Sequence, residues 1–177
     1  LGRIVSALPT QVTGGTEYNR SVAATWFVSE AELSGAARCV LRLSCFLAPT
    51  PITQDLFLRE PDTFREALVL CGHRGEESLD ELCEEALVQL DSYSLVDLAA
   101  TEFSCHRLLA TVQRERLPDA ERTTWLSFVL RIVATATKVD PYDVRSWAVL
   151  APMQSHVLEL VDHADRLGIA NPTVLLM

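Results

Sequence analysis

Apolar residues recur with the spacing of an α-helix in two stretches of the first hundred residues. In residues 34–48 they follow one helical face, with Ser34 as a suitable N-cap and Pro49 as a stop. Residues 78–92 begin with a capping-box motif and continue as one apolar stripe: Leu79, Leu82, Cys83, Ala86, Leu87 and Leu90. Both stretches are predicted to be amphipathic helices. A shorter helix is expected at residues 52–58, and residues 59–77 show no clear pattern.

The periodicity changes directly after residue 92. Residues 95–99 and 103–106 surround a short tip at residues 100–102, which is typical of a small β-hairpin. Helical spacing then returns with Leu108, Leu109 and Val112. Three helices, a hairpin and a further helix predict a winged-helix domain at residues 18–117. The expected fold class is all-α with a small β-hairpin.

The two ends of the chain predict parts of neighbouring regions. Residues 1–17 are interpreted as the tail of a preceding helical domain and a linker, because an apolar segment is followed by Pro9 and two glycines. Residues 118–177 are expected to form a helical arm and the truncated start of tetratricopeptide-like repeats. In that repeat unit, one helix covers residues 144–151, and a second begins at Pro152 and stops near Gly168. We therefore expect an internal piece of a longer protein.

The charge of the chain argues against nucleic acid as a partner. The net charge is −9, and residues 76–91 carry seven carboxylates without a Lys or Arg. Because binding to a phosphate backbone needs clustered cations, the third predicted helix is not expected to read DNA. No uncharged apolar run reaches the roughly 18 residues of a membrane span, and no signal peptide precedes the first helix. These features predict a soluble, cytoplasmic protein.

The sequence lacks the usual motifs of catalysis and metal binding. The chain has no Walker A sequence, and the loop at Gly14 and Gly15 lacks the lysine of a phosphate-binding loop. His73, His156 and His163 do not have the spacing of metal ligands. The five cysteines are scattered through mostly apolar segments and are expected to be free, buried and small hydrophobes. The chain is therefore predicted to be non-enzymatic, with no cofactor or metal of its own.

Four sequence segments together resemble a known family. They are SVAATW at residues 21–26, AARCVL continuing to FLAP at 36–49, ALVQL and YSLV within 86–96, and CHRLL at 105–109. In this order they are similar to the region after the NTPase core of bacterial NB-ARC proteins with tetratricopeptide-type repeats. These proteins belong to the STAND class of signalling NTPases, and the resemblance covers about residues 18–170.

The resemblance implies a regulatory function. In the family, the winged-helix domain closes over ADP bound to the NTPase domain, and a histidine in a Met-His-Asp-type motif contacts the β-phosphate. His106 occupies the matching position, Cys105 replaces the Met, and Arg107, a possible supporting residue, replaces the Asp. The implied ligands are ADP or ATP with Mg in the parent protein. The implied partners are its own NTPase domain and a protein or other trigger bound by the repeats.

Other interpretations stay open from the sequence. His106 could be an ordinary hydrogen-bonded residue at a strand-to-helix junction, with no role in nucleotide sensing. The chain could also be a protein-interaction module that docks partners through residues 78–92 or 144–167. A winged helix of a transcriptional regulator is the third interpretation, opposed by the acidic third helix. Some self-association is expected through apolar surfaces that the NTPase core would otherwise cover.

Overall fold

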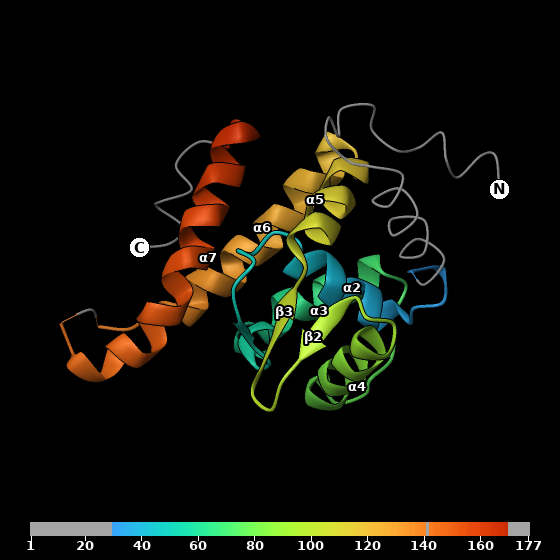
Figure 1. Cartoon of the computed structure of the whole chain (residues 1–177), viewed down its shortest axis with the longest axis horizontal. Helices are drawn as coiled ribbons and strands as arrows, with labels where there is room; N and C mark the ends of the chain where they lie inside the picture. Colours follow the sequence, from blue (N-terminus) through green and yellow to red (C-terminus); the bar gives the residue numbers. More distant parts are fainter. Residues whose placement is uncertain (1–29, 141, 170–177) are drawn as a thin grey trace.

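The computed structural model describes residues 30–140 and 142–169 (Figure 1). Within these residues the fold is mostly helical, with six α-helices and a small three-stranded antiparallel sheet. The predictions for residues 1–17 and for the end of the chain, and the segment at 21–26 that carries part of the resemblance, lie outside the described residues. In chain order the elements are α2 (Gly35–Ser44), β1 (Ile52–Thr53), the 3-10 helix η2 (Leu56–Arg59), α3 (Pro61–Leu70), α4 (Leu79–Ser92), β2 (Val96–Leu98), β3 (Glu102–Cys105), α5 (Arg107–Arg116), α6 (Asp119–Ala136), the 3-10 helix η3 (Val144–Ser146) and α7 (Trp147–Arg166).

The two helices with the clearest sequence pattern, α2 and α4, are confirmed. The Ser34 hydroxyl caps α2 by accepting a hydrogen bond from the Ala37 amide at 3.1 Å, as predicted. The prediction of a capping box at the start of α4 is wrong, because the Ser78 hydroxyl makes no capping hydrogen bond. Ser78 and Glu81 are both exposed, so water can satisfy the first amides of this helix. The apolar stripes of both helices are buried against each other and the rest of the core.

The segment between α2 and α4 differs from the prediction of a short helix at residues 52–58. Ile52 and Thr53 form a strand instead, and Ile52 lies opposite Phe103 in the sheet. A 3-10 turn and then α3 follow, with Pro61 in the first turn of α3, where its missing amide costs no helical hydrogen bond. The local pattern of two residues could not reveal this strand, because its pairing partner lies about fifty positions further along the chain.

The predicted hairpin is confirmed, and it forms the sheet together with β1. The strand order is β1-β3-β2, with all pairs antiparallel. Phe103 on the central strand pairs with Ile52 on one side and with Leu98 on the other. Since Phe103 and Ile52 are almost completely buried, one face of this small sheet contributes to the core.

Helix α6 packs against four other elements. Its contacts with α2, α3, η2 and α7 explain why residues 125–133 are mostly apolar, whereas the first turns of the helix are polar and exposed. The Trp125 ring is 2% exposed and contacts Phe128 edge to face, and the Arg42 guanidinium lies 5.5 Å from the Trp125 ring centre. The buried residues on this helix are Trp125, Leu126, Phe128, Val129, Leu130, Ile132, Val133 and Ala136.

The prediction of two helices at residues 144–151 and from Pro152 onward is wrong. One helix, α7, runs through Pro152, and it turns back alongside α6 after the η3 segment (Figure 1). Pro152 lies inside α7 on an exposed face, where its missing amide removes one helical hydrogen bond, and the packing of the helix against α6 compensates for this loss. The predicted stop at Gly168 is confirmed: Gly168 has a φ of +67°, and the Ile169 amide donates back to the Ala164 carbonyl. The helical pair is therefore α6 with α7.

No helix within residues 30–140 and 142–169 is both long enough and apolar enough to cross a bilayer.

Candidate functional site

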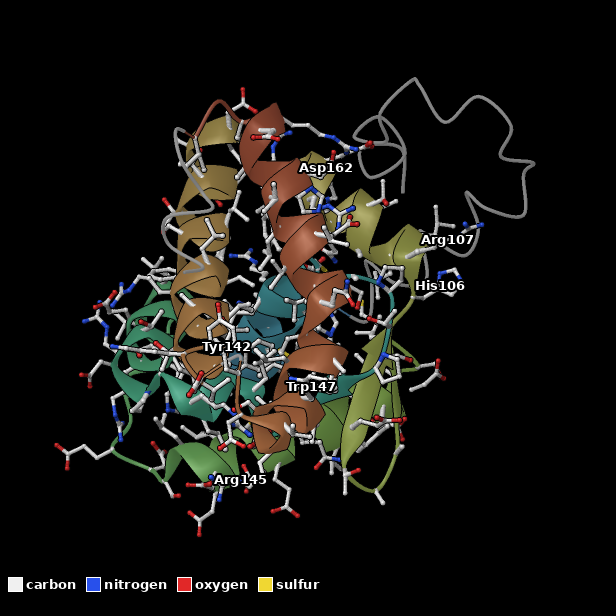
Figure 2. The ribbon with its side chains drawn as sticks, turned by 90° about the vertical axis from the view of Figure 1, so that its left-hand side faces the viewer. His106, Arg107, Tyr142, Arg145, Trp147 and Asp162 are labelled. Carbon is white, nitrogen blue, oxygen red and sulfur yellow. The ribbon has the colours of Figure 1, made fainter. Side chains whose placement is uncertain are left out.

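His106 stands between β3 and α5, at the strand-to-helix junction that the sequence predicted. It is the N-cap of α5, and its Nδ1 accepts a hydrogen bond from the Leu108 amide at 3.2 Å. The side chain is exposed on the same edge of the molecule as Arg107, as Figure 2 shows. The junction fixes the position of the ring relative to the sheet, and the residue is exposed.

The capping contact sets the chemistry that the His106 ring can offer. Because Nδ1 accepts a hydrogen bond, the neutral ring carries its proton on Nε2. Nε2–H is then a donor at the opposite side of the imidazole, as contact with an anionic oxygen requires. Arg107, the first residue of α5, is exposed beside it and adds positive charge. The two residues form an edge suited to an anionic group on a facing surface.

The opposite charge is found on α4. The exposed face of this helix presents carboxylates around Val88, and with Ser34 and Gln89 they border a shallow hollow. The backbone amide of Ser34 donates to Gln89 Oε1 at 3.0 Å, which ties this face to the start of α2. The exposed acidic residues of α4 are Asp80, Glu81, Glu84, Glu85 and Asp91. A phosphate backbone approaching this helix would meet negative charge.

Two histidines on α7 are buried, which the sequence reasoning did not anticipate. His156 Nε2 lies 3.2 Å from the Pro51 carbonyl, and the His163 ring contacts the Phe46 ring edge to face with centres 6.0 Å apart. Burial lowers the pKa of both rings, in the case of His163 to about 4, where the positive charges of Arg114 and Arg166 also contribute. Their spacing of seven residues, two helical turns, was the signal that could have placed both on the inner face.

The five cysteines are free and buried, as predicted. Two pairs of thiols lie close enough for one to influence the pKa of the other: Cys39 with Cys71, and Cys45 with Cys105. Burial is the main cause of the raised pKa of Cys39, whereas the neighbouring Cys39 thiol lowers the pKa of Cys71. Among the residues that the structure describes, no three His, Cys, Asp or Glu side chains gather in a way that could hold a metal ion.

Comparisons with protein-family models, with curated proteins and with solved structures gave no match.

Proposed function

We propose that this chain is the winged-helix lid, with its attached helical arm, of a STAND-class signalling NTPase. The order of elements supports the proposal: α2, α3 and α4 precede the β2–β3 hairpin and α5 follows it, as in a winged helix. The strand β1 adds to the hairpin and completes a three-stranded sheet. The acidic exposed face of α4 supports a role in regulation rather than DNA binding.

The observation that carries the proposal is the position of His106. It follows directly on β3, it is exposed, and its Nδ1 accepts a hydrogen bond, so that the neutral ring carries its proton on Nε2. In the proposed closed state, Nε2–H donates to the β-phosphate of ADP held by the NTPase domain, and Arg107 adds electrostatic attraction. Exchange of ADP for ATP then weakens this contact and releases the lid, which is a two-state element biased by its ligand.

The chain supplies no catalytic step in this proposal. Its residues contribute a donor, a positive charge and a rigid connection, while the NTPase domain holds the nucleotide and the Mg²⁺. The α6–α7 pair continues from α5 and would carry the movement of the lid to a helical sensor region.

A second candidate function is an interaction module without a nucleotide role. The acidic hollow on α4, with Val88 55% exposed at its centre, favours a basic segment of a partner protein. This candidate does not need His106, so substitution of His106 separates the two functions.

The test compares the natural full-length protein with His106→Asn and His106→Ala variants. Asn keeps a side-chain oxygen that can cap α5, whereas Ala removes both the cap and the Nε2–H donor. The nucleotide bound to each purified protein is identified, and ADP release is timed. Loss of one hydrogen bond to a charged phosphate costs about 1.5–3 kcal/mol, so both variants should release ADP roughly 10 to 100 times faster.

The matched pair shows which role of His106 matters. Equal acceleration in the two variants supports phosphate contact, because only the donor is lost in both. Acceleration in the Ala variant alone assigns His106 a capping role. Unchanged ADP retention in both variants contradicts the proposal and favours the interaction module.

A further inference from the structure

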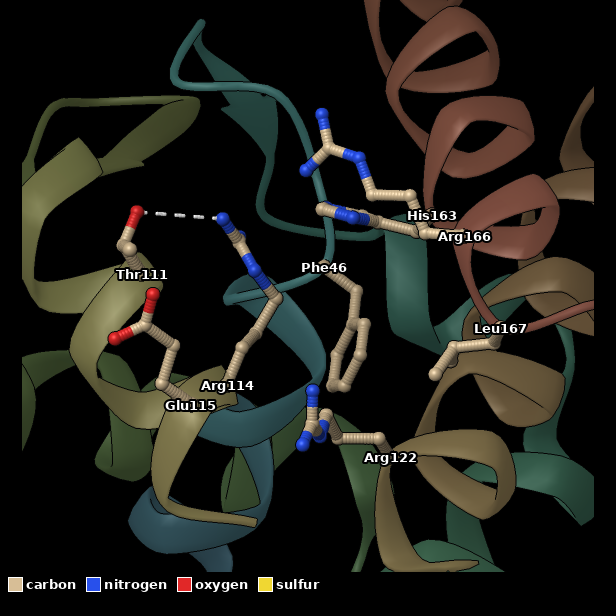
Figure 3. A pocket seen from close by; sticks show the side chains of 8 residues that line it. All are labelled: Phe46, Thr111, Arg114, Glu115, Arg122, His163, Arg166 and Leu167. Carbon is tan, nitrogen blue, oxygen red and sulfur yellow. Dashed lines mark hydrogen bonds between the residues drawn. The ribbon is translucent and has the colours of Figure 1, made fainter. Parts of the chain in front are cut away.

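A small pocket lies where α5, α6 and α7 meet the segment that follows α2 (Figure 3). Its volume is about 180 Å³. The lining includes cationic side chains from all three helices, Arg114 from α5, Arg122 from α6 and Arg166 from α7, together with the His163 ring of α7. In a chain of net charge −9, three arginines converging on one small pocket is an unusual concentration of positive charge. The lining includes a single carboxylate, that of Glu115.

Arg114 is the fixed element of this pocket. Its guanidinium donates to the Cys45 carbonyl and, at 3.4 Å, to Thr111 Oγ1, so that it is tied to the end of α2 and to its own helix. A guanidinium has five N–H donors, and these two contacts leave others for a ligand. In Figure 3 the Arg166 guanidinium lies above the His163 ring and the Arg114 guanidinium lies to its left. A preorganised donor of this kind loses little freedom when an anion binds.

The electrostatics at the His163 ring agree with this geometry. Burial is the largest cause of its lowered pKa, and the positive charges of Arg114 and Arg166 come next. The opposing influence of Asp162 is smaller. Arg114 and Arg166 therefore both disfavour a positive charge on this ring, and the Glu159 carboxylate lies 3.2 Å from its Nε2.

One polar atom in the pocket wall has no hydrogen bond. His163 Nε2 is buried and lies 3.2 Å from Glu159 Oε1, but in an orientation that makes no hydrogen bond. An unsatisfied buried nitrogen is costly, and a small rotation of the ring would let an oxygen of a bound anion accept a hydrogen bond from it.

Two carboxylates compete for the same arginines, but from exposed positions. Asp162 pairs with Arg166 at 2.6 Å and Asp119 pairs with Arg122 at 2.7 Å, with the two Asp side chains 49% and 83% exposed. Exposed ion pairs of this kind contribute little free energy. A dianion that contacts two arginines at once can therefore displace them.

We propose that this pocket binds a small oxyanion of the phosphate class, either free phosphate or the phosphoryl group of a phosphomonoester. Its volume is below the roughly 300–1,000 Å³ of sites for drug-sized ligands, which suits a group of this size. The bound oxyanion bridges α5 and α7 and so fixes the helical arm against the sheet-containing part of the molecule. The site is separate from His106, and it stands whether or not the nucleotide function holds.

The first test is a calorimetric titration of the full 177-residue chain at constant ionic strength. Inorganic phosphate and glycerol 3-phosphate are the two probes, with glycerol and chloride as blanks. Saturable binding of one phosphate per chain is expected, and tighter binding of one probe identifies the natural source of the phosphoryl group. Absence of saturable binding at millimolar concentrations of both probes overturns the proposal.

Two variants of equal charge show whether the pocket is responsible. Arg166→Gln removes a pocket cation whose side chain is 69% exposed, and Arg145→Gln removes an Arg that is 91% exposed and also paired with an Asp. The first should weaken phosphate binding about tenfold, the effect of one lost charge-assisted contact, and the second should leave it unchanged. Equal weakening in both variants would reduce the effect to overall charge and overturn the site.

A third variant should tighten phosphate binding instead of weakening it, and NMR gives an independent measurement at the same site. Glu115→Gln removes the carboxylate in the lining from an exposed position, so it should tighten binding severalfold. Phosphate should also raise the pKa of His163, followed by NMR of the imidazole, because a bound anion offsets the two neighbouring arginines. An unmoved His163 titration with saturable binding places the phosphate elsewhere and contradicts the assignment.

Discussion

Helices α4 and α7 both pack one face against the molecule, but with different chemistry. The inner face of α4 is entirely apolar: Leu79, Leu82, Cys83, Ala86, Leu87 and Leu90. The inner face of α7 carries two histidines among Met153, Leu160 and Ala164. It is held in addition by a hydrogen bond between Thr50 Oγ1 and Ser155 Oγ at 2.9 Å.

This difference indicates which part of the fold depends on pH. An interface made only of apolar side chains does not depend on pH, whereas an interface with neutral buried histidines weakens as the pH falls and protonation becomes favourable. We therefore expect the packing of α4 to be the same across this pH range and the packing of α7 to vary with pH. An oxyanion between Arg114 and Arg166 would act on that same interface.

The largest expected effect tests the permanence of α4. Leu90 is fully buried, so Leu90→Ala should lower the free energy of unfolding by about 2–5 kcal/mol through lost burial and a residual cavity. Leu158→Ala on α7, where the side chain is 65% exposed, is the control and should change it by less than about 0.5 kcal/mol. Urea unfolding followed by circular dichroism measures both. Similar values for the two variants would contradict the packing described for α4.

The next largest effect is a weakening of the packing of α7 at low pH. Because the folded-state pKa of His163 is about 4, against 6.5 in the unfolded chain, only the unfolded state takes up protons between these values. Docking of α7 is then fully stable above pH 6.5 and is weakened as the pH falls, with His163 alone costing about 2 kcal/mol by pH 5. His156 acts in the same direction.

Amide hydrogen exchange measures the stability of each helix separately, once the intrinsic pH dependence of exchange has been corrected for. Amides of α7 should lose protection between pH 7 and pH 5, while those of α4 keep theirs. His163→Phe keeps an aromatic contact with Phe46 and removes the titrating group, so the loss in α7 should become smaller. Equal loss in both helices would show that α4 and α7 unfold as one unit, and the contrast between them would fail.

The smallest effect measures one polar contact of the α7 interface. A double-mutant cycle of Thr50→Val and Ser155→Ala should give a coupling free energy of about 1 kcal/mol, the usual net value of one hydrogen bond. Each single variant is also compared with wild type, so that loss of packing is separated from loss of the bond. A coupling near zero would mean that water replaces this contact freely.

The sequence predicted the elements whose partners are not needed to recognise them. The apolar stripes of α2 and α4, the hairpin at β2 and β3 and the stop at Gly168 each follow from local spacing or a local backbone requirement. The junction position of His106 followed from the same local reasoning, because a change of period marks where a strand gives way to a helix. Its role in nucleotide sensing stays a prediction.

Two errors at β1 and α7 have a common physical cause. Ile52 and Thr53 become a strand only because Phe103 and Glu102 supply a partner, and the intrinsic preference of two residues is too weak to show this. Pro152 predicted a helix start, but the packing of α7 on α6 outweighs the loss of one hydrogen bond near the end of a long helix. In both places contact with a distant segment overrides local preference.

The sequence by itself determined the mostly helical class, the amphipathic α2 and α4, the acidic face of α4 and the hairpin that places His106. Only the tertiary structure decided that β1 joins the sheet, that His156 and His163 face inward, and that Arg114, Arg122 and Arg166 line one pocket. The physical reason is the distance along the chain between the residues that interact. Helical and strand periodicities are set by neighbours a few residues away, whereas a pocket is made by side chains that the chain brings together from separate helices.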